Sequence, residues 1–372
     1  MKLPLVVFGL LAALLLAGLW ESLRHRRHVQ QIPIRILVNG TRGKTSVTRL
    51  LTAALQGGGL VTRGKSTGTD PREMLPDGTE IETLRPRGAR ITEVKGFFRR
   101  AVKDNAQAVV IECMAVHPEM QSVFARLLVR PTHTIITNSW VDHVEEIGAT
   151  REETARSLSA SLIPGTVLIT DDSAFLSWPE RVPGDTSPLP PSYAERFSFP
   201  IFESNLSLVL AAAKLCGVDR QTALDAMPRA LPDAGMAGPF QMGGSRVINS
   251  FAANDPVSAA QAAQGAREMA GKGKLIILYN NRADREYRLR TFLPVLRSLA
   301  DLSPTLYIVG DNTGKVARFF GKRLSYPSLP LDSGRLLDSA FYQEEQTIFC
   351  IGNTKGPGHA MLRYLIENGG KA

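Results

Sequence analysis

The sequence predicts an α/β protein of two domains, with helices on both faces of parallel-rich β-sheets and a membrane helix ahead of the first domain. Three observations support this prediction. Apolar strands alternate with helical segments, a glycine-rich loop before Lys44 joins a strand to a helix, and residues 3–20 carry no charge. The 372 residues leave room for two domains, each with its own core.

The composition narrows the class of protein. Hydrophobic residues make up 44% and charged residues 21% of the chain, which excludes a disordered or collagen-like protein. Three cysteines without metal-ligand spacing predict neither a disulfide framework nor a zinc site. The net charge of +9 suits an anionic partner. Nucleic acid is not favoured, because the chain has no recognition motif and no aromatic residues interleaved with its basic ones.

The N-terminal segment is expected to be a membrane anchor. Residues 3–20 are eighteen uncharged residues ending in Trp20, and as a helix they would span about 27 Å. Arg24, Arg26 and Arg27 follow, so the positive-inside rule places the rest of the chain in the cytoplasm. A cleaved signal peptide is the alternative, but no small-x-small pair precedes the basic cluster. We therefore expect a single-pass protein of the cell membrane.

After this anchor, strands and helices alternate, which favours parallel sheets. The expected strands are 34–38, 108–111, 134–137, 166–170, 246–248, 275–279, 305–309 and 347–351, and the expected helices include 45–55, 152–162, 205–215, 257–270 and 291–299. Thr150 with Glu153 predicts a capping box, and Asp255-Pro256 predicts the start of another helix.

A break rich in glycine, proline and methionine at 232–244 marks the expected domain boundary. We therefore expect an anchor at 3–20, a central domain at 30–235 and a smaller C-terminal α/β domain at 236–372.

The strongest motif is a phosphate-binding loop that follows the first expected strand. It consists of Gly40, Thr41, Arg42, Gly43, Lys44 and Thr45. Glycines let the backbone approach phosphate oxygens, and the free N–H groups of the helix N-terminus favour an anion. Lys44 is expected to reach the terminal phosphates of ATP and Thr45 to bind Mg²⁺. The loop is a variant of the usual pattern, because Val38 stands where that pattern has its first glycine.

A second, similar segment lacks the residue that binds the metal. Gly310 to Lys315 also follows an expected strand, but Val316 replaces the hydroxyl that follows the lysine in the first loop. We expect this segment to be an ordinary loop and helix start.

Polar residues at the ends of the next two strands complete the expected site. Glu112 ends an apolar run, and Asn138, Asp142 and His143 follow the 134–137 strand. Strand ends of a parallel sheet meet at one crevice, so Glu112 is expected to share Mg²⁺ with Thr45. A salt-bridged strand end remains the alternative for Glu112, a structural histidine for His143 and a helix cap for Asp142.

The expected second domain offers two further strand-end motifs, around Asn254 and around Arg282. The planar guanidinium of an arginine neutralises the charge of a transferring phosphoryl group well. A solvated loop is the alternative for both motifs.

Together these motifs resemble the ATP-dependent Mur ligase superfamily, which includes the folylpolyglutamate synthases. The segments NGTRGKTSVTRL, ECMAVHPEMQ, TNSWVDHVEEIG, FAANDPVSA and NNRADR resemble more closely the membrane-associated ligase subunits of poly-γ-glutamate synthases, of the PgsB/CapB type. The resemblance implies a Mur-ligase-like central domain followed by a smaller Rossmann-like domain.

The resemblance also implies an activity. A chain-terminal γ-carboxylate is activated by ATP and Mg²⁺ as an acyl phosphate, and glutamate then displaces phosphate, which extends poly-γ-glutamate for a capsule or a secreted polymer. It implies catalytic roles for Lys44, His143 and Arg282, nucleotide contacts for Asn138 and Asn254, and metal ligation by Thr45, Glu112 and His143. The implied partners are a polytopic membrane subunit and accessory proteins of the synthase complex.

The sequence departs from the family pattern in two respects, and two alternative functions remain open. Mur ligases generally use a carbamylated lysine as a metal ligand, but no lysine lies between Lys103 and Lys214, and Glu145 or Glu146 is a candidate replacement. The chain is also expected to lack a separate N-terminal substrate domain, which would favour a free amino acid or polymer as substrate. The alternative functions are a related ligase with another substrate and a membrane-tethered ATPase or switch without amide chemistry.

Overall fold

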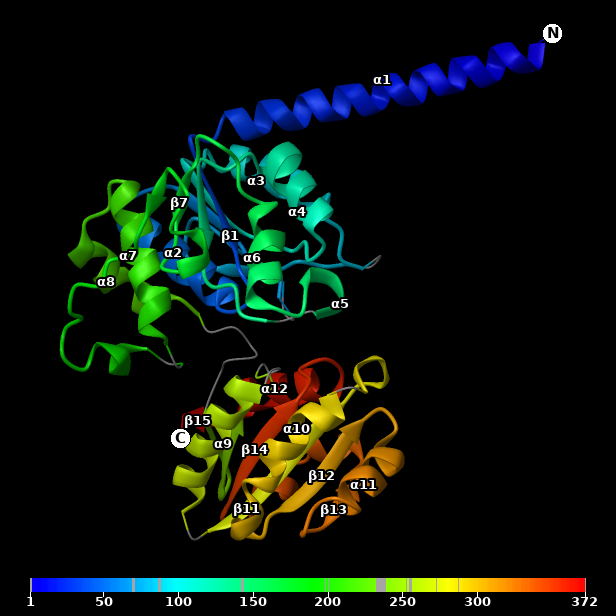
Figure 1. Cartoon of the computed structure of the whole chain (residues 1–372), viewed down its shortest axis with the longest axis vertical. Helices are drawn as coiled ribbons and strands as arrows, with labels where there is room; N and C mark the ends of the chain where they lie inside the picture. Colours follow the sequence, from blue (N-terminus) through cyan, green and yellow to red (C-terminus); the bar gives the residue numbers. More distant parts are fainter. Residues whose placement is uncertain are drawn as a thin grey trace. The chain divides into compact units, whose positions relative to one another are not determined.

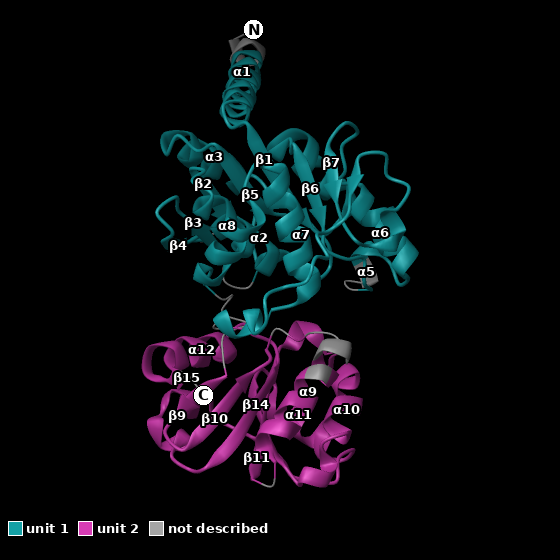
Figure 2. Ribbon diagram, turned by 90° about the vertical axis from the view of Figure 1, so that its left-hand side faces the viewer, with its two compact units in different colours: residues 1–196, 201–231 teal, residues 197–200, 232–372 magenta. Residues whose placement is uncertain are grey.

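The computed structural model divides the chain into two compact units. Unit 1 contains residues 1–196 and 201–231, and unit 2 contains 197–200 and 232–372 (Figure 2). The structure describes residues 2–68, 71–85, 88–141, 144–197, 199, 201–231, 239–251, 253, 256–271, 273–286 and 288–371.

A single long helix, α1 (Lys2–Gln30), opens unit 1. Its apolar side chains from Val7 to Leu23 are exposed, and its first turns project away from the rest of the unit (Figure 1). Among the described residues it is the one helix long and apolar enough to cross a membrane, over Val7–Gln30. The helix is longer than the 3–20 anchor that the sequence predicts, because it continues without a break through the basic residues after Trp20.

The last turns of α1 belong to the core of unit 1. The ring nitrogen Nε2 of His25 lies 2.8 Å from the carbonyl oxygen of Leu128, and Lys95 forms an ion pair with Glu21 at 2.9 Å. Val29 and Ile32 are fully buried in the hydrophobic core. The body of unit 1 therefore begins directly where the apolar part of α1 ends.

Unit 1 is built on an eight-stranded sheet with the strand order β4-β3-β2-β5-β1-β6-β7-β8. Its strands are β1 (Ile34–Asn39), β2 (Thr62–Lys65), β3 (Arg72–Met74), β4 (Glu80–Glu82), β5 (Ala108–Glu112), β6 (His133–Ile136), β7 (Val167–Ile169) and β8 (Arg181–Val182). Neighbouring strands in the series β2-β5-β1-β6-β7-β8 are parallel. β3 and β4 extend the sheet beyond β2 by antiparallel pairing. The carboxyl ends of β1, β2, β5 and β6 therefore lie along one edge.

Helices cover both faces of this sheet. One face packs against α3, the π-helical turn η1 and the end of α1, and α2 contacts β5, α7 and α8 on the other (Figure 2). The helices of unit 1 after α1 are α2 (Lys44–Gly57), α3 (Glu93–Lys103), α4 (Pro118–Val123), η1 (Phe124–Val129), α5 (Val144–Ile147), α6 (Arg151–Ser159), η2 (Ser173–Phe175), η3 (Tyr193–Arg196), α7 (Glu203–Leu215), α8 (Arg220–Ala226) and η4 (Met227–Arg229). The predicted capping box of Thr150 and Glu153 opens α6.

Unit 2 contains a seven-stranded sheet with the order β13-β12-β11-β14-β10-β9-β15, parallel from β13 to β10. Its strands are β9 (Phe240–Met242), β10 (Ser245–Asn249), β11 (Lys274–Asn281), β12 (Thr305–Gly310), β13 (Ser328–Pro330), β14 (Gln346–Gly352) and β15 (Gly370–Lys371). Its helices are α9 (Pro256–Ala270), η6 (Ala283–Arg285), α10 (Arg288–Arg297), η7 (Ala300–Leu302), α11 (Thr313–Gly321), η8 (Ser333–Leu337), η9 (Ser339–Tyr342) and α12 (Pro357–Asn368).

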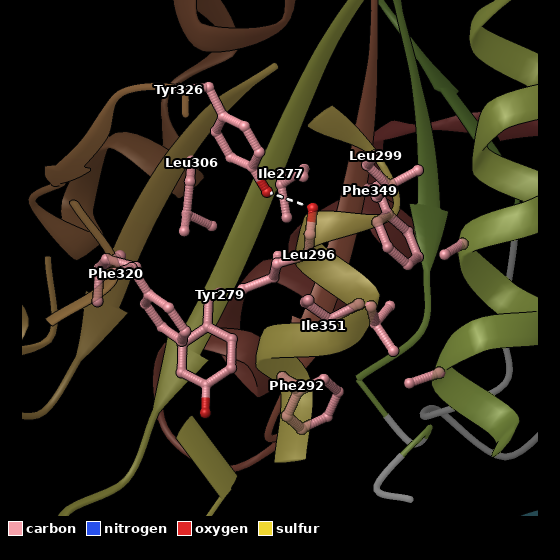
Figure 3. Close-up of a cluster of buried hydrophobic side chains, with 14 of the residues drawn as sticks. Ile277, Tyr279, Phe292, Leu296, Leu299, Leu306, Phe320, Tyr326, Phe349 and Ile351 are labelled. Carbon is pink, nitrogen blue, oxygen red and sulfur yellow. Dashed lines mark hydrogen bonds between the residues drawn. The ribbon is translucent and has the colours of Figure 1, made fainter. Parts of the chain in front are cut away.

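Two hydrophobic clusters cover the two faces of the unit 2 sheet. In one of them, Tyr279 packs edge-to-face against Phe292 and Phe320, with ring centroids 5.6 and 5.3 Å apart (Figure 3). The other cluster joins the sheet to α12. Buried apolar residues on both faces are typical of a parallel α/β sheet, so the predicted fold class is confirmed.

Candidate active site

The phosphate loop lies between β1 and α2, as predicted. Gly40 and Gly43 adopt φ values of 127° and 84°, a region that favours glycine. A Cβ atom on Gly40 would lie 2.1 Å from the hydroxyl oxygen of Thr137, so the loop also approaches β6 too closely for a side chain. Backbone conformation and close packing thus both require glycine here.

Lys44 is the first residue of α2, and its side chain folds back over the loop. Its Nζ donates to the carbonyl oxygen of Gly40 at 2.7 Å and to that of Thr41 at 3.3 Å. A lysine held in this way places its charge beside the N-terminus of a 14-residue helix, where the free N–H groups are already positive. The loop therefore concentrates positive charge at the position expected for phosphate.

Asn138 fixes the phosphate loop. Its Oδ1 accepts hydrogen bonds from the Thr41 hydroxyl at 2.6 Å and the Arg42 N–H at 3.1 Å, and its Nδ2 donates to the Arg42 carbonyl at 3.1 Å. The Thr137 hydroxyl donates to the same carbonyl at 2.6 Å. The amide of Asn138 therefore holds the loop from both of its polar ends, a positioning role that the sequence does not predict.

Glu112 lies at the end of β5 with only 3% of its surface exposed. The Thr45 hydroxyl lies 3.1 Å from both of its carboxylate oxygens, and the Thr67 N–H donates to Oε2 at 2.7 Å. Within the described part of the chain, this carboxylate forms no ion pair. A buried carboxylate without a cation is costly, so the site has the chemistry of a cation ligand.

The oxygen atoms of Thr45 and Glu112 fit Mg²⁺. This ion prefers oxygen ligands and is usually held by one or two carboxylates together with substrate phosphates and water. The described residues contain no group of three or more histidine, cysteine or acidic side chains that could hold a metal alone. A metal bound by Thr45 and Glu112 would therefore complete its coordination with phosphate and water.

Replacing Gly43 by alanine is expected to lower nucleotide affinity at least about tenfold. The positive φ costs a residue with a Cβ about 1–2 kcal/mol, and the new Cβ would lie 2.6 Å from Oδ1 of Asn205 on α7. Gly59→Ala is the matched control, because Gly59 has a φ of 81° but open space around its Cβ position. Calorimetric titration with ATP checks the prediction, and equal affinities of the two variants would contradict it.

Asp172 holds the segment that follows Asn138. Its Oδ2 accepts from the N–H and the hydroxyl of Ser139 at 2.6 and 2.8 Å, and Arg151 pairs with Oδ1 at 2.9 Å. Burial alone would raise the pKa of this carboxyl. The hydrogen bonds from Ala174 and Ser139, together with the charge of Arg151, outweigh it and hold the pKa below its usual value.

Asp172→Asn is expected to lower the free energy of unfolding of unit 1 by about 2 kcal/mol near neutral pH, because charged hydrogen-bond partners are lost. A carboxyl whose pKa is lower in the folded state stabilises the folded protein at pH values above its unfolded-state pKa of about 3.9. This stabilisation is lost as the pH falls through the folded-state pKa. The difference from wild type should therefore be constant from about pH 5 to 8 and narrow below about pH 4. Urea unfolding followed by tryptophan fluorescence measures it, since Trp20, Trp140 and Trp178 all lie in unit 1. A difference that grows on acidification would contradict the prediction.

Several predicted residues lie outside the described residues. These are Asp142, His143, Asn254 and Asp255, together with the side chain of Glu145. Glu146, the other candidate for the place of the carbamylated lysine, is exposed. Arg282 lies at the end of β11 in unit 2 and pairs with Asp284, with Nη2 2.6 Å from Oδ2. The first unit therefore brings together Gly40 to Thr45, Glu112 and Asn138, and the second unit contains Arg282.

The end of β11 also carries two buried asparagines, Asn280 and Asn281, which belong to the predicted strand-end motif around Arg282. Asn280 donates to the carbonyls of Asn353 and Lys355 at 2.5 and 2.9 Å, and Arg288 donates to Oδ1 of Asn353 at 2.5 Å. These contacts fix the glycine-rich turn that precedes α12.

Comparison with known proteins identifies the family of each part. Residues 38–177 match the Mur ligase middle domain, and residues 237–368 match the poly-gamma-glutamate synthase CapB C-terminal domain. The chain is 32% identical to the PGA synthase CapB of Bacillus subtilis, covering 96% of both chains. It is 28% identical to the capsule biosynthesis protein CapB of Bacillus anthracis, covering 95% of this chain and 81% of the relative.

Solved structures share the fold at low sequence identity. Escherichia coli FolC in complex with ADP has a TM-score of 0.69 at 15% identity, with 91% of each chain covered. MurF from Acinetobacter baumannii has a TM-score of 0.67 at 16% identity, covering 93% of this chain and 79% of MurF. A folylpolyglutamate synthase from Yersinia pestis, complexed with AMPPNP and a manganese ion, has a TM-score of 0.67 at 14% identity, covering 92% and 91%. The chain has the Mur ligase and FolC type of α/β fold, and it belongs to the CapB family of poly-γ-glutamate synthases.

Proposed function

We propose that this protein is an ATP-dependent amide ligase that extends poly-γ-glutamate by adding glutamate to a chain-terminal γ-carboxylate. The observation that carries the proposal is the buried Glu112 carboxylate facing the Thr45 hydroxyl beside the phosphate loop. Family membership supports the type of reaction, and the names of the relatives support the polymer.

ATP binds with its phosphates along Gly40 to Thr45, and Lys44 neutralises the terminal phosphates. Thr45 and Glu112 would hold Mg²⁺ there, and the ion would offset the negative charge of the triphosphate. Asn138 keeps the loop in the geometry that accepts phosphate, since its side chain bonds to both Thr41 and Arg42. His143 serves as a further metal ligand or contacts the acyl phosphate.

The reaction has two steps. A γ-carboxylate oxygen attacks the γ-phosphorus of ATP, and the bond from that phosphorus to the bridging oxygen breaks, releasing ADP. The amine of glutamate then attacks the carbonyl carbon of the acyl phosphate, loses a proton and expels phosphate, which retains the attacking carboxylate oxygen. Activation is needed because a carboxylate is a poor electrophile, and the protein contributes mainly positioning and charge neutralisation.

Two residues of the C-terminal domain take the remaining proposed roles. We divide the chain functionally at the same boundary as the sequence predicts, with residues 30–235 binding the nucleotide and 236–372 supplying Arg282 and Asn254. Arg282 neutralises phosphoryl charge and Asn254 contacts the nucleotide.

The protein acts at the cytoplasmic face of the cell membrane. The exposed apolar part of α1 and the basic residues after it support a single-pass anchor. A polytopic membrane subunit and accessory proteins are the partners that would carry the growing chain away from the site.

The test is ADP release by membranes that contain the protein and its co-encoded partners, with Mg²⁺-ATP and a panel of amino acids. The proposal predicts release that depends on L- or D-glutamate and is accompanied by γ-linked polymer. Release that is indifferent to every amino acid would replace it with a membrane-tethered ATPase. Stimulation by another amino acid would keep the ligase chemistry and change the substrate.

A further inference from the structure

The loop that follows β2 lies beside both expected metal ligands and contacts one of them. The Thr67 N–H donates to Oε2 of Glu112 at 2.7 Å. The next residue, Gly68, lies so close to α2 that a Cβ atom on it would stand 3.2 Å from the Thr45 hydroxyl. The position of this loop therefore determines how the Glu112 carboxylate faces Thr45.

Arg85 forms a hydrogen bond with the backbone of this loop. Its Nη1 donates to the Thr67 carbonyl at 3.2 Å, so the N–H of Thr67 contacts Glu112 while its carbonyl contacts Arg85. The same guanidinium donates to both carboxylate oxygens of Glu93, from Nε at 3.0 Å and from Nη2 at 2.6 Å. A bidentate pair fixes the plane of the guanidinium, which leaves Nη1 directed at the loop.

Lys65 forms a charged cluster with Glu93 and Arg85. Its Nζ lies 3.2 Å from Oε1 of Glu93, and only 1% of the lysine side chain is exposed. Burial lowers the pKa of Lys65, opposed by the carboxylates of Glu93 and Glu73. Because burying charged side chains is costly, this cluster is a poor source of stability and a good source of fixed geometry.

We propose that Arg85 is a positioning residue for the metal site, acting through Thr67 on the carboxylate of Glu112. The inference rests on the proposed role of Glu112 as a Mg²⁺ ligand and adds the contacts that orient it. Groups that orient a metal ligand commonly change metal affinity by about 10–100-fold when removed.

The experiment measures Mn²⁺ binding to the full-length protein with AMPPNP, by electron paramagnetic resonance of the free ion. Mn²⁺ replaces Mg²⁺ because both prefer oxygen ligands and Mn²⁺ gives a signal. Arg85→Gln is expected to raise the Mn²⁺ dissociation constant about tenfold, while AMPPNP affinity in the presence of EDTA stays within about twofold of wild type.

Arg100→Gln is the matched control. Arg100 pairs with Glu73, with Nε 3.1 Å from Oε2, and Glu73 also retains Arg63 as a partner. The Arg100→Gln substitution removes an arginine–carboxylate contact in the same part of unit 1 without changing a contact of loop 66–68. The Mn²⁺ affinity of this variant should therefore equal that of wild type. Arg85→Lys serves if Arg85→Gln does not fold. It retains the charge but cannot hold Glu93 and the Thr67 carbonyl with the same planar geometry, so an intermediate loss of Mn²⁺ affinity is expected.

Glu112→Gln distinguishes a failure of the metal site from a failure of the positioning role. If it leaves Mn²⁺ affinity unchanged, the proposed metal site and the role of Arg85 both fail. If Glu112→Gln weakens Mn²⁺ binding but the Arg85 variants match Arg100→Gln, the metal site stands and the positioning role of Arg85 is wrong. Equal weakening of metal-free nucleotide binding by Arg85→Gln would also overturn the inference, because it would indicate general damage to the site.

Discussion

Lys44→Ala is expected to lower the rate of glutamate-dependent ADP release about 10³-fold. The Lys44 ammonium lies over the phosphate loop, 2.7 Å from the Gly40 carbonyl, where it would neutralise charge on the transferring phosphoryl group. The fold should remain intact, because the side chain contributes only two partly buried hydrogen bonds, worth about 1 kcal/mol each at most. The comparison of rate and urea-unfolding midpoint separates catalysis from stability.

Lys315→Ala is the matched control for this prediction. Lys315 occupies the equivalent place in the similar Gly310 to Lys315 segment at the start of α11, but its side chain is 69% exposed and pairs with Glu286. Its replacement should leave ADP release unchanged. Normal polymer output from Lys44→Ala, or an equal loss from both variants, would contradict the assignment of the phosphate loop.

Glu112→Gln is expected to lower kcat/KM about 10²-fold and to raise the Mg²⁺ concentration needed for half-maximal rate. Glutamine has nearly the same shape and still accepts a hydrogen bond from the Thr67 N–H, but it lacks the charge that binds the cation. Titration of the rate with Mg²⁺ at fixed ATP measures both effects.

Glu119→Gln is the control, since Glu119 is an exposed residue in the first turn of α4 on the segment that follows β5. It should show the Mg²⁺ dependence of wild type. A Glu112→Gln variant with unchanged Mg²⁺ dependence would remove Glu112 from the metal site.

The sequence predicts the central strands well because their signal is local. The eight expected strands are all present within two residues of their expected bounds, since each is a short apolar run followed by turn residues. The antiparallel extension of β3 and β4 and the buried strand β2 were not predicted. β2 reads Thr-Arg-Gly-Lys, and such a polar strand is buried only because Arg63 and Lys65 find carboxylates on β3 and α3.

The contacts of the candidate site were also predictable only in part. The contact of Thr45 with Glu112, 67 residues away, was predictable because Thr45 follows β1 and Glu112 ends β5, and the carboxyl ends of these parallel strands share an edge. The contacts of Thr67 with Glu112 and Arg85 were not, because they depend on the backbone path of a loop. The capping box of α6 was predicted correctly because its two residues are neighbours in sequence.

The extent of α1 shows a further limit of local reasoning. Hydropathy ends the expected anchor at Trp20, because the charged residues Glu21 and Arg24 follow. The helix continues to Gln30 because His25 and Val29 pack into unit 1, and those contacts are tertiary. Charge alone therefore marks the end of the apolar segment but not the end of the helix.

Oxygen transfer from the acceptor carboxylate to phosphate distinguishes acyl phosphate formation from simple hydrolysis of ATP. Oligo-γ-glutamate and free glutamate, both labelled with ¹⁸O in their carboxylates, are incubated with the protein in its membranes and Mg²⁺-ATP, and the inorganic phosphate is analysed by mass spectrometry. Activation as an acyl phosphate predicts one ¹⁸O atom in the phosphate for each amide bond formed. Phosphate without label, released while ATP is consumed, would contradict the proposed ligase reaction, because the phosphoryl group would then have passed to water and not to the carboxylate.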